Sequence, residues 1–295
     1  MTTTQTLTEL YVHESGSPGA PAIVFLHPTA ANGGMWEQHM GRLAGYHCLA
    51  PDLPGHGRSN QLPWTSLDDT ARQVAALIED RIPARRAHMV GLSLGGALVH
   101  KLLAHRPERL DRVVIDGCGG GVLPARGAGL WKLAFALTAP LLHRKLVIGL
   151  LHRYLGGDPG DRAGRARFAA DLRAVSPAAF RRSFADANDK KNRFSREELS
   201  ALCPILLVAG EREPGTIRAS NAALAALMPN AVARFVPGAG HAWLTRAPEL
   251  HVRMWRPGLA GRSYRRGWLP RPPNGPPRRC SRCWIPVSGR RRPSW

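Results

Sequence analysis

The sequence VGLSLGG occupies residues 90–96 and places Ser93 between Gly91 and Gly95. An apolar run precedes it and predicts a short buried strand, and an apolar pattern of helical period follows it. A serine in such a sharp strand-to-helix turn has its hydroxyl exposed beyond the sheet, and the next backbone N–H points to the same space. The positive end of the helix lies there as well. Ser93 is therefore the candidate nucleophile, and the Leu94 amide is a candidate donor to the reacting oxygen.

Strand and helix patterns alternate on both sides of this turn. Six further segments have the apolar character of strands: residues 7–13, 22–26, 46–50, 112–117, 204–210 and 233–236. A helix is expected to begin after Ser66, where two aspartates occupy its first turn, and another covers residues 217–228. This alternation predicts an α/β fold with a doubly wound, mostly parallel sheet.

The alternation stops in the middle of the chain. Residues 122–199 have a helical, strandless pattern, and between Arg126 and Arg193 there are 14 Lys and Arg against 5 Asp. We interpret this segment as a helical lid inserted over the active edge of the sheet; the alternative is a set of additional packing helices. The core is then divided into residues 1–121 and residues 200–256.

The last segment, residues 257–295, has a different composition. It contains ten arginines and eight prolines but no Asp or Glu, and it supplies half of the net charge of +20. Such a composition cannot bury a core and predicts disorder. A nucleic-acid-binding tail and an out-of-frame translation remain two alternatives. Its single C-x-x-C, Cys280 to Cys283, has no second pair, so we expect no zinc site.

Length and composition limit the class of protein. A chain of 295 residues with 44% hydrophobic residues is long enough for one large α/β domain with an insertion. The absence of an apolar run of 18 residues argues against a membrane span, and the first residues do not resemble a signal peptide. Five scattered cysteines favour reduced thiols and a cytoplasmic location. Because no metal cluster, P-loop or dinucleotide fingerprint is present, no cofactor or metal is expected. The oligomeric state stays open.

Four motifs follow one another along the chain: HPT at residues 27–29 with Trp36 behind it, DLPGHGRS at 52–59, GLSLGG at 91–96 and GAGH at 238–241. In this order they resemble the α/β-hydrolase fold superfamily, in particular its cofactor-free members with a helical lid. The resemblance covers about residues 7–256. It implies that His241 is the catalytic histidine and that His27 and His56 serve loop structure.

The residue types themselves support a catalytic triad. A serine hydroxyl needs an adjacent base, and His241 follows a predicted strand at the edge where Ser93 is expected. The base needs a carboxylate that fixes its tautomer. Glu213 falls on the acid position that the resemblance implies, where Asp is commoner. Asp116, at the end of the preceding strand, and Glu211 are the alternatives.

The resemblance also implies an oxyanion hole formed by the backbone N–H groups of Thr29 and Leu94. Pro28, which has no N–H and cannot donate, replaces the glycine that is usual in the family. A serine nucleophile indicates acyl chemistry. We therefore expect hydrolysis of a carboxylic ester of a small hydrophobic substrate through an acyl-enzyme.

Other reactions are compatible with the same triad. A C–C bond hydrolase, a lactonase, a thioesterase and a cofactor-free perhydrolase are the catalytic alternatives. A ligand-binding protein on a hydrolase scaffold is an alternative of another class. In each case the expected partner is a small molecule, with no membrane and no nucleic acid bound by the core.

Overall fold

The computed structural model describes residues 10–119, 133, 137, 139–155, 160–189 and 203–259. In these residues seven strands form one sheet in the order β1-β3-β2-β4-β5-β6-β7. Their bounds are Val12–Ser15, Ala22–Leu26, His47–Pro51, Ala87–Leu92, Leu110–Asp116, Ile205–Gly210 and Ala231–Val236 for β1 to β7. Strand β1 is antiparallel to β3, and the other neighbouring pairs are parallel. The doubly wound, mostly parallel sheet is thereby confirmed.

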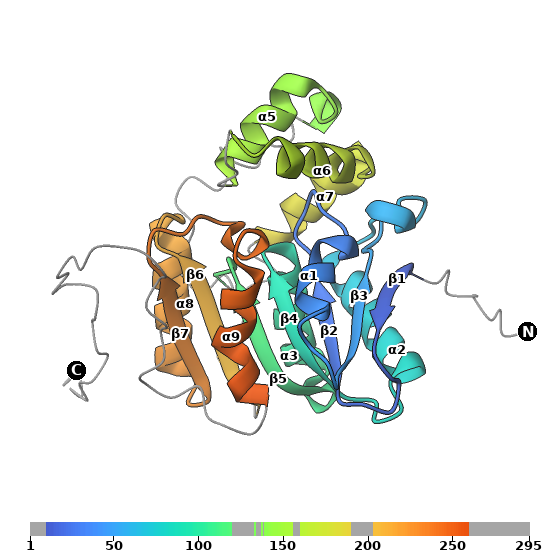
Figure 1. Ribbon diagram of the computed structural model, residues 1–295, viewed down its shortest axis with the longest axis vertical. Helices are drawn as coiled ribbons and strands as arrows, with labels where there is room; N and C mark the ends of the chain where they lie inside the picture. The colour runs from blue at the N-terminus through green and yellow to red at the C-terminus, as the bar shows by residue number, and fades with distance from the viewer. Residues whose placement is uncertain are drawn as a thin grey trace, which may run out of the picture. The chain divides into compact units, whose positions relative to one another are not determined.

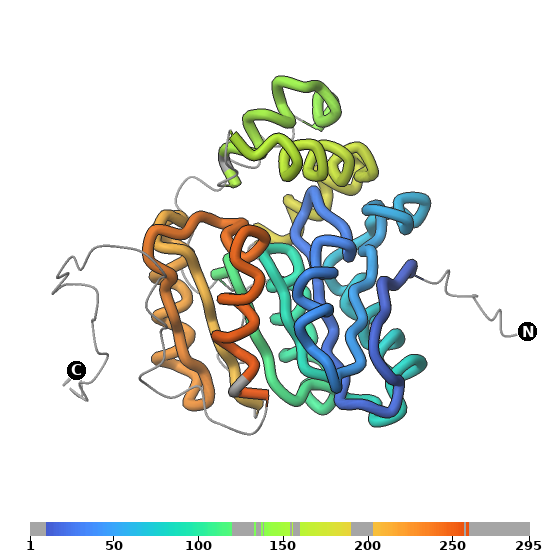
Figure 2. The backbone as a smooth tube through the Cα atoms, viewed as in Figure 1, coloured from blue at the N-terminus to red at the C-terminus, as the bar shows by residue number. Residues whose placement is uncertain are grey.

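Helices cover both faces of the sheet (Figure 1). On one face lie α2 (Leu67–Arg81), α3 (Leu94–His105) and α8 (Gly215–Leu227), and on the other lie α1 (Glu37–Met40) and α9 (Pro248–Leu259). Strands β2, β3, β4 and β6 are buried along their whole length, as the apolar runs predict for strands covered on two sides. The chain runs from β2 to the neighbouring β3 and then crosses back to β4 on the other side of β2 (Figure 2). Because these strands are parallel, their C-terminal ends lie at the same edge of the sheet.

Most of the expected elements agree with the structure to within two residues at each end, and two boundaries differ by more. The first strand covers Val12–Ser15 instead of residues 7–13, because its register with β3 begins only at Val12; residues 7–9 lie outside the described residues. Helix α9 (Pro248–Leu259) includes Pro257, Gly258 and Leu259, although we expected disorder from residue 257 onward. Trp255 and Leu259 are buried in the apolar cluster of that face, and this packing outweighs the helix-breaking effect of proline. The predicted disordered tail lies outside the described residues from 260 onward.

Between β5 and β6, the described parts of residues 122–199 contain the helices α5 (Lys145–Tyr154), α6 (Arg162–Arg173) and α7 (Pro177–Ala187), here called the inserted helices. Asp161 and Ser176 cap α6 and α7 by accepting hydrogen bonds from backbone N–H groups of the first turn. A separate apolar cluster joins these helices to Ala30 of the loop after β2. No helix in the described part of the chain is long and apolar enough to cross a membrane.

Candidate active site

Ser93 occupies the turn between β4 and α3 in a strained conformation. Its φ of 55° and ψ of −109° lie in a region that residues other than glycine rarely adopt. The Ser93 N–H donates to the carbonyl of Asp116 at 2.9 Å, and the Ser93 carbonyl accepts from Ala97 at 3.0 Å. Strand β5 and helix α3 thus hold the turn from both sides, and the side chain is only partly buried.

The glycines of the motif are required by contacts with backbone atoms. A Cβ atom on Gly91 would lie 2.5 Å from the carbonyl group of Gly95. A Cβ atom on Gly95 would lie 2.1 Å from the carbonyl oxygen of Leu26, the last residue of β2. The first turn of α3 therefore touches the point where the loop after β2 begins, which brings Leu94 close to that loop.

His241 and Glu213 form a hydrogen-bonded pair. The Nδ1 atom of His241 lies 3.0 Å from Oε2 of Glu213, whose other oxygen accepts from the Gly210 N–H at 2.9 Å. An ionised carboxylate only accepts, so Nδ1 carries the proton and Nε2 is left as the acceptor. The Glu213 side chain is fully buried, whereas that of His241 is 18% exposed. This is the arrangement of a general base held by an acid.

A single segment links Ser93 to His241. Gly117 directly follows Asp116, the residue that binds the Ser93 N–H, and a Cβ atom on Gly117 would lie 2.8 Å from the imidazole ring of His241. Gly117 has a φ of +60°, which also favours glycine. Among the described residues no hydrogen bond joins the Ser93 hydroxyl to His241; in free enzymes this contact is often long and tightens with substrate.

His27 fixes the peptide whose N–H is the second candidate oxyanion donor. Its Nε2 accepts from the Leu53 N–H at 2.9 Å, so its Nδ1 carries the proton and donates to the Pro28 carbonyl at 2.9 Å. Burial lowers the pKa of His27 to about 4 and keeps the ring neutral. In a trans peptide the N–H points away from the carbonyl, so fixing the Pro28 oxygen also orients the Thr29 N–H. In the described residues, neither the Thr29 nor the Leu94 amide donates to another backbone group.

The two alternative acids do not contact His241. Asp116 is fully buried, and its Oδ2 accepts from Nε1 of Trp243 at 2.9 Å. Burial, followed by the charge of Glu213, raises the pKa of Asp116 well above its ordinary value. Glu211 is exposed and accepts from the Gly238 N–H at 2.7 Å. Geometry therefore associates Glu213, and neither alternative, with the histidine.

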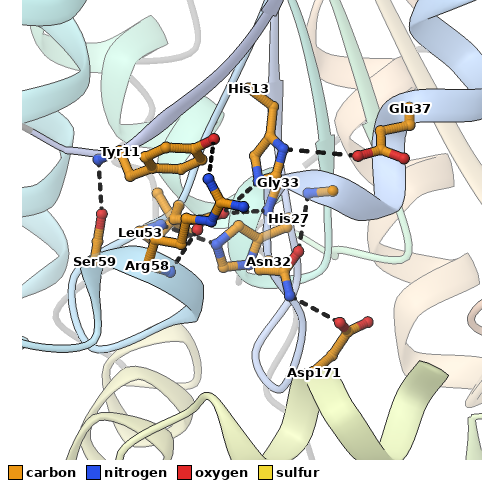
Figure 3. Close-up of polar contacts among 12 residues, drawn as sticks. Tyr11, His13, His27, Asn32, Gly33, Glu37, Leu53, Arg58, Ser59 and Asp171 are labelled. Atoms are coloured by element: carbon orange, nitrogen blue, oxygen red, sulfur yellow. Dashed lines mark hydrogen bonds and ion pairs between the residues drawn. The ribbon is translucent and has the colours of Figure 1, made fainter. Parts of the chain in front are cut away.

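Asp52, the first residue of the DLPGHGRS motif, connects two loops near the site. Its buried carboxylate accepts from the Gly33 N–H and the Arg58 N–H, both at 2.7 Å. Next to it, the Asn32 side chain donates to Asp171 of helix α6 at 2.8 Å (Figure 3). The inserted helices are thus attached to the loop that carries Thr29. Sequence analysis missed this contact, since its only signal was an acidic residue in a basic segment.

Two backbone hydrogen bonds attach the inserted helices elsewhere. The Ser176 N–H donates to the Gly55 carbonyl at 2.9 Å, and the Ala242 N–H donates to the Leu155 carbonyl, at the end of α5, at 3.1 Å. Ala242 directly follows the candidate base. The described residues contain no group of three His, Cys, Asp or Glu side chains placed to hold a metal ion.

Fold and site together define an α/β hydrolase, and comparison with known proteins agrees. The model of the alpha/beta hydrolase family matches residues 23–254, so the chain belongs to this family.

Individual relatives carry different names. The pimeloyl-[acyl-carrier protein] methyl ester esterase of Nitrosomonas europaea is 33% identical over 105 residues, which is 35% of this chain and 40% of the relative. A 2-hydroxy-6-oxononadienedioate/2-hydroxy-6-oxononatrienedioate hydrolase from Pseudomonas sp is 30% identical over 118 residues, 38% and 41% of the two chains. The matches thus span about two fifths of these curated relatives. The solved structure of Est816, described as an N-acyl homoserine lactone degrading enzyme, is 27% identical with a TM-score of 0.66, covering 84% of this chain and 96% of its own.

Proposed function

We propose that the protein is a serine hydrolase that cleaves a carboxylic ester of a small hydrophobic substrate through an acyl-enzyme. The observation that carries the proposal is the meeting of Ser93 and the His241–Glu213 pair at one segment, Asp116 to Gly117. A strained serine between a strand and a helix N-terminus, next to a histidine with a buried carboxylate partner, is the constellation used for nucleophilic acyl transfer.

In the proposed mechanism His241 takes the proton of Ser93 as the hydroxyl attacks the ester carbonyl. Glu213 holds the Nδ1–H tautomer and stabilises the imidazolium that forms. The N–H groups of Thr29 and Leu94 stabilise the developing oxyanion, each contributing about 3 kcal/mol to transition-state binding. His241 then protonates the leaving alcohol. In the second half, His241 takes a proton from the water that attacks the acyl carbonyl, the bond between the acyl carbon and the Ser93 oxygen breaks, and His241 returns the proton to Ser93.

The inserted helices act in this proposal as a lid that covers the bound substrate. Their apolar cluster, which includes Leu142, Ile148 and Phe180, packs against Ala30, the residue after the donor Thr29. This apolar packing beside the loop of Thr29 supports a hydrophobic acyl or alcohol group. The esterase name of the Nitrosomonas europaea relative supports the ester bond.

A lactone is the second candidate substrate, because a lactone is a cyclic ester and the structure of Est816 carries that description over 96% of its chain. The two candidates need the same residues and differ in the leaving alcohol, which remains attached to the acyl group when a lactone opens. A panel of linear esters of graded acyl length and N-acyl homoserine lactones of matching length separates them by kcat/KM.

Ser93→Ala is the decisive variant. We expect kcat to fall by a factor on the order of 10⁴ or more while the circular dichroism spectrum stays unchanged. The same substitution at the exposed Ser17 is the matched control and should leave kcat unaltered. Mass spectrometry of the wild type with a slowly hydrolysed ester should find the acyl group on the peptide that contains Ser93.

Retention of a tenth of the turnover by Ser93→Ala would exclude Ser93 as the nucleophile. Binding of the panel compounds by the wild type without turnover of any of them would support the non-catalytic alternative.

A further inference from the structure

Asp116 makes an unusual set of contacts for a fully buried acidic residue. Its Oδ2 accepts from the Trp243 indole N–H at 2.9 Å, and its Oδ1 has no hydrogen-bond partner among the described residues. A carboxylate has about four acceptor positions, and a buried carboxylate normally fills several of them. With a single donor in place, burying the charge costs more than burying the neutral acid.

The groups that face Asp116 do not supply the missing positive charge. On α9, Nε2 of His251 lies 3.8 Å from Oδ2, too far for a hydrogen bond. His251 is itself buried, and burial lowers its pKa well below the ordinary value, as does neighbouring His39. On the loop after β6, Glu213 adds negative charge. Burial and the charge of Glu213 thus raise the pKa of Asp116, and they outweigh the contacts with Trp243 and the Gly117 backbone, which lower it.

The Trp243 indole ties this buried group to the candidate base. Trp243 lies two residues after His241, in the short helix η7 (Trp243–Thr245), and is itself buried. Its indole N–H donates to Asp116, the last residue of β5. The next residue, Gly117, packs against the His241 ring. One hydrogen bond thus fixes the loop of His241 to the strand that also holds the Ser93 amide.

We propose that Asp116 is a positioning residue, held uncharged in the core, which anchors Trp243 and so keeps His241 in place beside Ser93. It does not compete with Glu213 for the histidine. This inference rests on the proposed role of His241 as the base.

Three variants test the positioning role by steady-state kinetics. Asp116→Asn keeps a neutral acceptor for the indole and should retain kcat within about threefold; Asp116→Leu removes the acceptor and should lower kcat at least about tenfold. Trp243→Phe should reproduce the loss, and the double variant Asp116→Leu/Trp243→Phe should be no worse than either single variant, since both remove one interaction.

The control for loss of a buried indole hydrogen bond is Trp64→Phe. Trp64 donates its indole N–H to Asp186 of α7 at 2.9 Å and makes no hydrogen bond to Asp116. It should leave the Trp243 indole proton as protected as in the wild type. Equal losses of kcat for Asp116→Asn and Asp116→Leu, or rapid exchange of the Trp243 indole proton in Trp64→Phe, would overturn the proposal.

The pH profile separates an uncharged from a charged Asp116. A negative charge here would stabilise the imidazolium of His241, so its removal in Asp116→Asn would move the midpoint of the kcat/KM profile to lower pH. We expect the midpoint to stay where it is in the wild type, whereas Glu213→Gln should move it. A midpoint displaced by about one unit in Asp116→Asn would show that Asp116 is ionised and contradict the proposal.

A substrate-free measurement distinguishes failure of this inference from failure of the proposed function. Nuclear magnetic resonance of the intact protein can follow the Trp243 indole proton, assigned by its loss in Trp243→Phe, and the Asp116 carboxyl carbon, assigned by its loss in Asp116→Asn. We expect a protected indole proton in the wild type and in Asp116→Asn, rapid exchange in Asp116→Leu, and a carboxyl carbon at its protonated shift at neutral pH. An ionised carboxyl signal would overturn the proposal whatever the enzyme does.

Discussion

Glu213 differs from the other two carboxylates near His241 in what its oxygens contact. One oxygen accepts from His241 and the other from the Gly210 N–H, so the buried charge has a fixed orientation. Glu211, two residues earlier, accepts from a backbone N–H at the surface. The two glutamates form a natural matched pair, because the same chemical change can be made at both.

Replacing Glu213 by glutamine should lower kcat by a factor on the order of 10³ to 10⁴, because an amide loses the charge and favours the wrong tautomer of the histidine. Glu211→Gln, the control, should stay within about twofold of the wild type, since surface changes away from the site are usually small. The measurement is kcat for the best ester of the panel, with melting temperatures for both variants. A larger loss at residue 211 would assign the acid to the other glutamate.

The residues of the candidate site differ in how far the sequence could predict them. The strand-to-helix pattern around Ser93 was sufficient to name the candidate nucleophile. His241 and Glu213 lie in loops that follow strands, and the resemblance to the α/β-hydrolase fold superfamily was needed to name them. Trp243 and Asp171 act through partners 127 and 139 residues away. The residues next to them in the sequence do not indicate such pairs, because the pairs form only when the fold brings distant segments together.

At the level of elements, the close contact between α3 and the end of β2 lies beside the candidate site. The helix begins directly over the carbonyl of Leu26, and only a glycine at residue 95 permits that distance. The same contact places the loop of Thr29 beside the first N–H groups of the helix. Stability and catalysis therefore depend on one close approach.

Gly95→Ala should destabilise the fold by about 2 kcal/mol or more, since its Cβ atom would overlap a backbone oxygen that cannot rotate away. It should also lower kcat in the fraction that folds, by moving Thr29 away from Leu94. Chemical denaturation and active-site titration measure the two effects. Gly19→Ala is the control, because no atom lies within 4 Å of its added Cβ. Similar stability of the two variants would contradict the close-approach argument.

Elements were predictable where their own residues supply the signal. The continuous apolar runs of β2, β4 and β6 identified buried strands, and Ser66 identified the start of α2, where its side chain caps the Asp69 N–H. The predicted bounds of β1 and the predicted start of the disordered segment at residue 257 were wrong, because they depend on the partner strand and on the burial of Leu259, neither of which is local.

For the whole molecule, buried histidines dominate the expected response to acid. Burial lowers the pKa of His27 to about 4 and those of His39, His56 and His100 to about 3. An unfolded histidine takes its proton at about pH 6.5. Below that pH the unfolded chain binds protons at these histidines and the native protein does not. The histidines therefore leave the free energy of unfolding unchanged above about pH 6.5 and lower it as the pH decreases. Each histidine contributes a slope of about 1.4 kcal/mol per pH unit.

A typical protein has a free energy of unfolding of about 5–15 kcal/mol. Four such histidines would reduce this free energy to zero within roughly one to three pH units below pH 6.5. We therefore expect the protein to unfold in acid with a midpoint at about pH 5. Circular dichroism measures this transition. His39→Phe should move this midpoint about half a unit lower, because one proton fewer is gained on unfolding. The same substitution at the exposed His105 is the control. An unchanged midpoint in His39→Phe would contradict the assignment.

The attachments of the inserted helices have a consequence for chimaeric enzymes. Two of them, Ser176 to Gly55 and Ala242 to Leu155, join backbone to backbone, so the hydrogen bonds themselves require only an N–H at the donating position, which proline lacks. The contact of Asp171 with Asn32 requires a side-chain acceptor. A set of inserted helices taken from another family member therefore needs a side-chain acceptor at the position of Asp171 in α6. Overall sequence similarity is less important. Under the proposed function, substrate range can then change in the inserted helices while Ser93, His241 and Glu213 stay unaltered.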